Sequence, residues 1–337
     1  MRVAVIGTGR MGMRHLRVVR QLGWEIAGIL DRNQGALVQA GNQFGIPNAR
    51  QYGDARRLFE DGKPDCVIVA TTAPGYAPLT CQAAEAGARY ILCEKPMATS
   101  LAECDEMIST CERHGARLAI NHQMRFMPHY LAIREILQSD DFGGWSSITV
   151  IAGNMGLAMN GVHYFELLRW LSGENPSQVE AWLCADQIPN PRGAQFKDTG
   201  GSIRVTTPSG KRLYMDLGPD QGHGIRIVYA GRTGMLAGDE LSGQMQMSLR
   251  RAEHRELPTA RYGMPSQDSN FQLVPADTIA PTRSLLEALI AGRDYPTGEQ
   301  GRAAIATLVA AHVSDQNGHH AVATDQMLPR ALEFQYP

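Results

Sequence analysis

The sequence has few of the features that mark secreted, membrane or nucleic-acid-binding proteins. Its 337 residues carry a formal net charge of only −2, which offers no electrostatic attraction for nucleic acid or for an anionic membrane surface. No apolar run reaches the length of a transmembrane helix. The first predicted strand starts at Arg2, so no signal peptide is expected before it. We therefore expect no membrane or nucleic-acid partner.

Cysteine is also scarce, with six residues at positions 66, 81, 93, 104, 111 and 184. None forms a CxxC pair, and none is grouped with other residues at a spacing typical of metal ligands. Most lie within apolar strand or helix patterns, as small buried side chains do. The sequence thus predicts reduced thiols, no metal site and a cytoplasmic location.

The length and the hydrophobic fraction of 43% predict a globular protein with two domains. The main local signal is at the start, where an apolar, β-branched run over residues 2–6 is followed by GxGxxG at Gly7, Gly9 and Gly12. In a dinucleotide-binding turn the first glycine permits a tight turn and the second lets the pyrophosphate approach the backbone. The third lets the following helix pack closely. Residues 11–21 have helical spacing, so their N-terminus would face the phosphates.

A second predicted strand, Glu25–Leu30, ends at Asp31, which lies 19 residues after Gly12. An acidic residue about 20 residues after the last glycine is where the ribose 2′-hydroxyl of NAD is bound. Asp31 would repel a 2′-phosphate and therefore favours NAD, but Arg32 could accept that phosphate, so NADP stays possible. The alternative is an ordinary α/β unit with a solvated aspartate.

Strands and helices alternate over the first 120 residues, which predicts a doubly wound parallel sheet of the Rossmann type in an α/β fold. Antiparallel patterns then prevail, with helices at 128–138, 162–171, 281–291 and 298–314. We expect a Rossmann domain over residues 1–122 and an α+β domain over 123–337 with a large, mostly antiparallel open sheet. An open face on that sheet would favour a dimer. The expected strands lie at 2–6, 25–30, 66–70, 90–93, 117–121, 146–152, 178–186, 202–207, 211–217, 225–230 and 235–239.

Two polar groups are candidates for chemistry. Lys95, within Glu94-Lys95-Pro96, follows the predicted strand Tyr90–Cys93 at the sheet edge where ligands bind. It could remove the proton of an alcohol, or it could simply lead the chain into solvent. His163 lies in the first turn of a later helix, where it could transfer protons or pack structurally. Glu166, three residues later, could orient His163, or its negative charge could simply be stabilised by the positive end of the helix dipole.

These pieces together resemble the glucose–fructose oxidoreductase / inositol dehydrogenase / rhizopine-catabolism (Gfo/Idh/MocA) family over nearly the whole chain. The combination of Glu94-Lys95-Pro96 with the distant His163 helix is specific, whereas the glycine turn alone is not. The segments that carry the resemblance are Gly7–Gly12, Ala86–Pro96, Arg125–Pro128, Gly161–His163, Leu168–Gly173, Lys197–Thr199, Pro296–Glu299 and Ala310–Ser314.

The resemblance implies an NAD(P)-dependent dehydrogenase or reductase that acts on a secondary alcohol or ketone of a sugar, cyclitol or sugar derivative. Lys95 would contact the substrate hydroxyl and the cofactor ribose, and His163 would complete the proton-transfer group. A homodimer or homotetramer would form through the second sheet. The expected cofactor contacts are Gly7, Thr8, Gly9, Arg10, Met11, Gly12, Asp31, Arg32, Thr71, Thr72, Glu94, Lys95 and Gln123. The expected substrate contacts are Asn121, Arg125, Met159, Asn160 and Tyr164.

One departure leaves the acid/base group open. Four residues before the histidine the family usually has an aspartate, whereas this chain has Met159. Methionine cannot accept a proton, so Lys95 or His163 would serve alone, with Tyr164 or Asn160 as hydrogen-bond partners. Two other functions also fit the sequence. One is glycosidic bond cleavage through transient oxidation by tightly held NAD, and the other is a non-catalytic dinucleotide-binding role.

Overall fold

The chain folds into two compact units in the computed structural model, which describes residues 1–188, 190, 192–258, 265–274, 277–325 and 327–336. The first unit comprises Met1–Phe126, Asp277–Ile305 and Pro329–Pro337. The second comprises Met127–Ala276 and Ala306–Leu328. These units differ from the expected domains 1–122 and 123–337, which stay a prediction.

The first unit contains a six-stranded sheet of order β3-β2-β1-β4-β5-β6, the order of a dinucleotide-binding Rossmann fold. All its strand pairs are parallel, which confirms the predicted sheet. β3 was not expected, because two residues are too few to show a periodic pattern. The strands are β1 (Arg2–Ile6), β2 (Glu25–Leu30), β3 (Gln51–Tyr52), β4 (Cys66–Val69), β5 (Tyr90–Cys93) and β6 (Arg117–Ile120).

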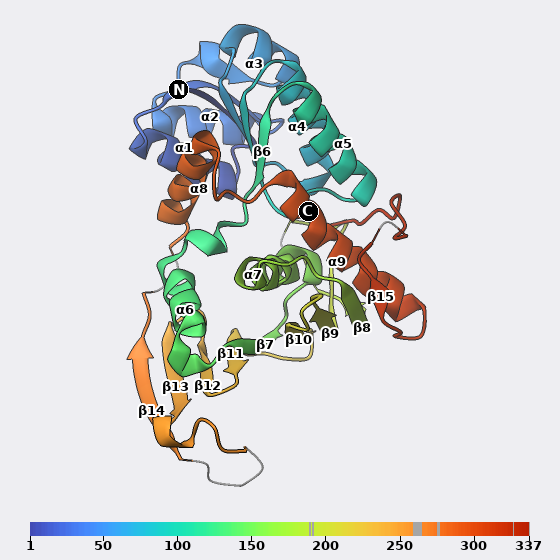
Figure 1. The fold of residues 1–337 in the computed structure, drawn as a ribbon. Coiled ribbons are helices and arrows are strands. Elements are labelled where there is room, and N and C mark those ends of the chain that lie inside the picture. Colours follow the sequence, from blue (N-terminus) through green and yellow to red (C-terminus); the bar gives the residue numbers. More distant parts are fainter. Residues whose placement is uncertain (189, 191, 259–264, 275–276, 326, 337) are drawn as a thin grey trace. The chain divides into compact units, whose positions relative to one another are not determined.

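Helices cover both faces of this sheet, with α1, α2 and α8 on one side and α3, α4 and α5 on the other (Figure 1). Because both faces are covered, the central strands are apolar and buried throughout rather than alternating. The helices are α1 (Arg10–Gln21), α2 (Gln34–Phe44), α3 (Ala55–Gly62), α4 (Tyr76–Glu85), α5 (Leu101–Arg113) and α8 (Ile279–Ala291).

Helix α8 belongs to this unit although it is distant in sequence. Its Leu285, Leu286 and Leu289 are fully buried in one core cluster with residues of β1 and α1, including Val5 and Leu16. Sequence reasoning could predict this helix but not its packing partner, because an apolar helix face does not reveal which surface it covers. The short helix η3 (Gln123–Phe126), which follows β6 in the chain, also contacts α8.

The second unit is built on a nine-stranded sheet of order β14-β13-β12-β11-β7-β10-β9-β8-β15. Among the strand pairs of the described residues, β7–β10 alone is parallel, so the predicted mostly antiparallel sheet is confirmed. The strands are β7 (Trp145–Gly153), β8 (Gln178–Gln187), β9 (Thr199–Thr206), β10 (Arg212–Gly218), β11 (Arg226–Gly231), β12 (Gly234–Asp239), β13 (Gln244–Arg250), β14 (Ser266–Gln272) and β15 (Val322–Ala323).

The two faces of this sheet differ. One face is apolar and buried, with Val150, Val205, Leu213 and Ile227 pointing into the core. The helices of this unit are α6 (Pro128–Gln138), α7 (Val162–Ser172) and the later part of α9 (Gly298–Gln316). Helix α7 contacts β10. Strands β13 to β15 were not predicted. β14 carries mostly polar side chains at an exposed edge, and β15 has two residues. β13 lies between β12 and β14, and its alternation of polar and apolar residues was missed.

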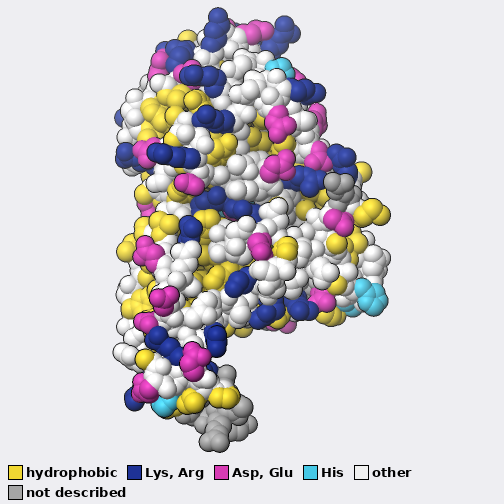
Figure 2. Space-filling model, in the orientation of Figure 1, with side chains coloured by type: hydrophobic (Ala, Val, Ile, Leu, Met, Phe, Trp, Pro, Cys, Tyr) yellow, Lys and Arg dark blue, Asp and Glu magenta, His cyan; other side chains and the backbone are white. Residues whose placement is uncertain are grey.

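No helix in the described part of the chain is both long and apolar enough to cross a membrane. All six cysteines are free thiols, and five of them are buried. Within the described ranges, no three His, Cys, Asp or Glu side chains gather in a way that could hold a metal ion. On the face shown in Figure 2, basic and acidic side chains are interspersed rather than gathered into a patch of one sign.

Burial of His129 makes the stability of this fold depend on pH. The side chain is 3% exposed in the first turn of α6, and burial lowers its pKa from 6.5 to about 4. The unfolded chain therefore takes up a proton at this site near pH 6.5, whereas the folded chain does not until about pH 4. We expect the free energy of unfolding to fall through this window as pH decreases, by up to about 1.4 kcal/mol per pH unit.

Urea unfolding of a His129→Phe variant across this pH window measures the effect. The variant should lose this part of the pH slope, and His114→Phe, at an exposed position, serves as the matched control. An identical slope in wild type and His129→Phe would contradict the prediction.

Candidate active site

The glycine turn between β1 and α1 has the geometry that its sequence predicts. Gly7 has a φ of +91°, and a Cβ at this position would lie 2.5 Å from the Ala70 carbonyl oxygen. A Cβ on Gly12 would lie 1.8 Å from the Gly7 carbonyl oxygen, so only glycine permits this approach. A Cβ on Gly9, by contrast, would meet nothing within 4 Å. The second glycine thus borders open space, as a pyrophosphate site requires.

The N-terminus of α1 suits an anionic group. Its N-cap is Gly9, whose lack of a side chain leaves the first N–H groups without a side-chain cap. No acidic residue lies in the first turn, which begins at the exposed Arg10. The helix dipole adds positive potential at the same place. The residues present therefore fit a dinucleotide phosphate.

Asp31 lies directly after β2 and is bonded to the glycine turn. Its Oδ2 accepts hydrogen bonds from the Thr8 backbone nitrogen at 2.6 Å and the Thr8 hydroxyl at 3.0 Å. Its Oδ1 accepts one from the Asn33 backbone nitrogen at 2.8 Å. These bonds orient the carboxylate while the residue stays partly exposed, and Arg32 beside it is exposed. A carboxylate has lone pairs left for a further donor such as a ribose hydroxyl.

Glu94, directly after β5, is buried among three elements of the first unit. Its Oε1 lies 2.7 Å from His15 Nε2 in α1 and accepts a hydrogen bond from Asn121 Nδ2 at 2.8 Å after β6. Burial alone would raise the pKa of Glu94. Its hydrogen bonds with His15 and Asn121, together with the charges of His15 and Lys95, outweigh burial and hold that pKa below its ordinary value. The side chain is therefore an ionised carboxylate at neutral pH.

Lys95 is the one residue of the run Ile91–Ser100 that is not buried. It follows β5 at the carboxyl edge of the sheet, where ligands bind in doubly wound folds, and its peptide bond to Pro96 is cis. Thr71 and Thr72, two predicted cofactor contacts, follow β4 at the same edge. The structure thus brings the turn at Gly9, Thr71, Glu94 and Lys95 to one edge of one sheet.

Two predicted ligand contacts form hydrogen bonds to other protein side chains. The Gln123 side-chain oxygen accepts a hydrogen bond from the Thr282 hydroxyl of α8 at 2.7 Å. Arg125 donates to the Gln300 side-chain oxygen of α9 at 2.9 Å. Both side chains are buried, and both bonds anchor η3 to C-terminal helices of the first unit. Their roles toward a ligand stay predictions.

In the second unit, His163 lies in the first turn of α7 and is partly exposed. A π-helical turn, η5 (Leu157–Gly161), leads directly into this helix and contains Met159 and Asn160. Asp198 stabilises this turn, because its carboxylate accepts hydrogen bonds from the backbone nitrogens of Ala158 at 3.0 Å and Met159 at 2.9 Å. Such π-helical turns occur frequently at functional sites.

Other side chains of α7 have different partners. Glu166 binds Arg169 with both oxygens, at 2.6 and 3.1 Å. The Tyr164 hydroxyl donates to Glu240 at 2.9 Å, next to the buried Tyr130 and Tyr229. Burial raises the pKa of Glu240 and, well above its usual range, that of Tyr164. Tyr164 is 3% exposed, so it packs inside the second unit.

Sequence reasoning assigned no role to His15, Asp198 or Glu240. His15 follows Gly12 by three residues and so lies on the face of α1 that packs against the sheet, a spacing that could have indicated it. Asp198 was noted only within the motif Lys197–Thr199. Nothing in the sequence pointed to Glu240, because its partners come from distant segments.

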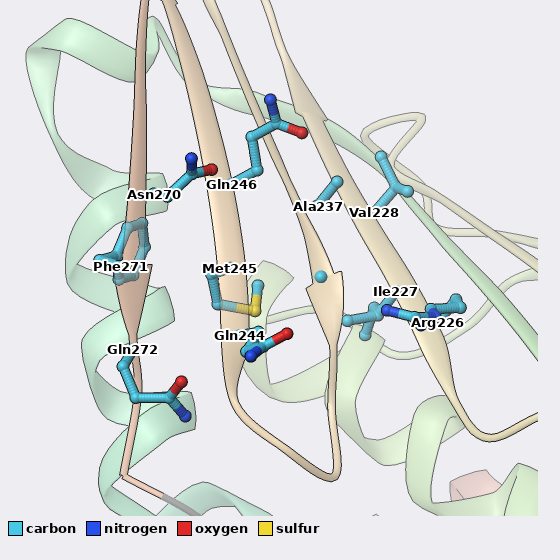
Figure 3. Close-up of a pocket in the computed structure, with 11 residues that line it drawn as sticks. Arg226, Ile227, Val228, Ala237, Gln244, Met245, Gln246, Asn270, Phe271 and Gln272 are labelled. Carbon is cyan, nitrogen blue, oxygen red and sulfur yellow. The ribbon is translucent and has the colours of Figure 1, made fainter.

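A hollow of about 670 Å³ lies elsewhere, on strands β11 to β14 of the second sheet (Figure 3). Amide side chains line much of it, including Gln244, Gln246, Asn270 and Gln272. It contains none of the residues predicted for cofactor or substrate, so it is not the candidate active site.

Residues 1–122 match the family model GFO_IDH_MocA, described as an oxidoreductase family with an NAD-binding Rossmann fold. A D-apiose dehydrogenase of Paraburkholderia graminis is 34% identical over 188 residues, covering 51% of this chain and 49% of that protein. The match thus spans about half the length of that relative. Inositol 2-dehydrogenase 2 of Saccharopolyspora erythraea is 29% identical over 255 residues, covering 70% of this chain and 73% of that protein.

A crystal structure of an oxidoreductase from Agrobacterium radiobacter in complex with NAD+, L-tartaric acid and magnesium has the same fold. Its TM-score is 0.80 at 21% identity, covering 97% of this chain and 99% of that chain. An NAD-binding Rossmann fold is indicated by the family match, by the similar relatives and by the glycine turn, whose second glycine borders open space. Over residues 1–122 the chain is therefore similar to the Gfo/Idh/MocA family of oxidoreductases with an NAD-binding Rossmann fold.

Proposed function

We propose that the protein is an NAD-dependent dehydrogenase or reductase that acts on a secondary alcohol or ketone of a sugar or cyclitol. The observation that carries this proposal is the carboxyl edge of the first sheet. There a glycine turn suited to a pyrophosphate lies in one unit with a partly exposed lysine in an otherwise buried run. The relatives named for D-apiose and inositol support the substrate class.

The proposed chemistry divides between cofactor and protein. Bound NAD would accept the hydride, or bound NADH would supply it, at the reacting carbon. Lys95 would take the hydroxyl proton during oxidation and return it during reduction. The ionised Glu94 next to it supplies a negative charge that balances a protonated Lys95. His163, in the second unit, is the second proposed proton-transfer residue, because Met159 cannot hold a proton.

The glycine turn gives a first test of cofactor binding. Gly9→Ala places a methyl group in the open space proposed for the pyrophosphate, without a clash inside the protein. We expect the dissociation constant for NADH, measured by fluorescence titration, to rise by about tenfold or more, which corresponds to about 1.4 kcal/mol. Its melting temperature should stay close to that of the wild type.

Two further glycine variants serve as controls for this test. Gly12→Ala should instead destabilise the fold by about 1–3 kcal/mol, because its Cβ overlaps the Gly7 carbonyl. Gly222→Ala, where a Cβ also meets nothing within 4 Å, should change neither quantity. Unchanged NADH binding in Gly9→Ala would remove the phosphate site from this turn.

Turnover tests the proposed reaction directly. Nicotinamide absorbance should change when purified protein is given NAD with one class among sugars, cyclitols, uronic acids and sugar nucleotides. Asp31 should make NAD a better cofactor than NADP. Lys95→Met should lower kcat by about 10²–10⁴-fold, since it removes the proton acceptor and leaves a side chain of similar size.

Lys63→Met is the matched control, since it makes the same exchange at an exposed lysine. Full activity in Lys95→Met would rule out the proposed role of Lys95 in proton transfer. Silence across the panel, in protein that binds NADH, would contradict the dehydrogenase function and favour internal-redox glycoside cleavage or a non-catalytic role.

We also propose that the open face of the second sheet joins copies of this chain into a homodimer or homotetramer. Four large apolar side chains on this face are 36–51% exposed: Ile151, Trp182, Tyr214 and Met235. The strand register places all four on the face opposite the buried core. Apolar groups gathered on one sheet face favour burial against another surface.

A cytoplasmic location, supported by the six free thiols, is proposed as well.

Sedimentation velocity checks the oligomer. Ile151→Glu and Trp182→Glu should each lower the sedimentation coefficient toward the monomer value, because burying an unpaired carboxylate in the interface is unfavourable. Val38→Glu, which exchanges an exposed apolar residue in α2 of the first unit, should leave the assembly intact. A wild-type protein that sediments as a monomer would refute the proposal.

A further inference from the structure

The backbone around Lys95 is held on both sides. Before it, Glu94 is fixed by His15 and Asn121. After it, Ser100 caps helix α5 by accepting a hydrogen bond from the Glu103 backbone nitrogen. The Glu103 carboxylate reaches back to the Thr99 nitrogen at 2.7 Å and the Thr99 hydroxyl at 2.6 Å. Between these supports lies the buried stretch from Pro96 to Ala98.

A segment from far along the chain lies against this stretch. Residues 329–336 belong to the first unit, although residues 306–328 before them belong to the second. The Tyr336 hydroxyl donates a hydrogen bond to the Ala98 carbonyl oxygen, and the Phe334 nitrogen donates to the Thr99 carbonyl oxygen at 3.0 Å. The Phe334 and Tyr336 rings stack with centroids 5.7 Å apart.

The other end of the segment is bonded to helix α5. The Ala102 nitrogen donates to the Arg330 carbonyl oxygen at 2.9 Å, and Arg330 forms an ion pair with Asp105. Side chains alternate between these ends, with Leu332, Phe334 and Tyr336 more buried than Ala331, Glu333 and Gln335. Such alternation is typical of an extended chain with one face packed. Tyr336 is only 1% exposed.

We propose that residues 329–336 are a strap that fixes the loop carrying Lys95, and that Tyr336 is its positioning residue. This inference rests on the proposed role of Lys95 in proton transfer. The Ala98 carbonyl lies three residues after Lys95, and its hydrogen bond to Tyr336 spans 238 positions of the sequence. A flexible lysine side chain reaches a reacting atom productively only when its backbone is fixed.

Removing one hydroxyl group tests the strap. Tyr336→Phe keeps the ring but leaves the buried Ala98 carbonyl without this donor, so the loop should shift or admit water. We expect kcat to fall about tenfold and the pH profile of kcat to move, because the surroundings of Lys95 change. The dissociation constant for NADH should stay within about twofold of the wild-type value. Gln335→Ala, at the exposed neighbouring position, is the matched control and should behave as wild type.

A second measurement needs no activity. An amine-modifying reagent, followed by peptide mass spectrometry, reports the accessibility of Lys95 relative to the exposed Lys63 of the same molecule. Tyr336→Phe should raise the ratio of Lys95 to Lys63 modification and speed hydrogen exchange over residues 94–100. Gln335→Ala should change neither.

The outcomes separate the strap from the proposed function. Unchanged Lys95 modification and unchanged exchange in Tyr336→Phe overturn the strap, whatever the activity. A kcat within twofold of wild type also overturns it, as does a loss explained by a smaller folded fraction in an active-site titration. If wild type turns over nothing but Tyr336→Phe shows the changes in modification and exchange, the strap stands and the dehydrogenase function fails.

Discussion

The buried carboxylate of Glu94 connects the parts of the first unit on which the candidate site depends. One of its oxygens is shared between His15 of the helix that follows the glycine turn and Asn121 at the end of β6. Burying a carboxylate is costly unless it is paired and hydrogen-bonded, so these partners must be in place when the chain folds. The arrangement couples the geometry of helix α1 to that of the Lys95 loop.

In the second unit, hydrogen bonds to Asp198 stabilise the irregular turn before His163. A π-helical turn has backbone N–H groups that its own helix does not satisfy, and the Asp198 carboxylate accepts two of them. The same unit buries one face of its sheet and leaves apolar side chains on the other. Its architecture thus combines a helix that begins at a stabilised turn with a sheet face that carries exposed apolar side chains.

Local patterns predicted most of the elements correctly. The helices over 128–138 and 281–291 end where the structure ends them, because their apolar spacing and flanking residues are strong local signals. Strand β14 escaped prediction, since an exposed edge strand needs no apolar alternation. Strand β13, which lies between β12 and β14, was missed although its alternation of Gln and Met is typical of a strand. Gln123 and Arg125 were expected beside a ligand, and the structure shows that they also form hydrogen bonds with Thr282 and Gln300. Partners so distant in sequence leave no trace in a local pattern.

The Rossmann sheet, the glycine turn and Lys95 at a strand end could be predicted from the sequence, because each depends on neighbouring residues and their spacing. The pairing of His15 with Glu94, the packing of α8 in the first core and the cover of residues 329–336 over the Lys95 loop are evident only in the folded chain. His15 and Glu94 are 79 positions apart in the sequence, and Ala98 and Tyr336 are 238 apart. These contacts follow from which buried polar groups and apolar faces can be satisfied together, a condition that exists only in the folded chain.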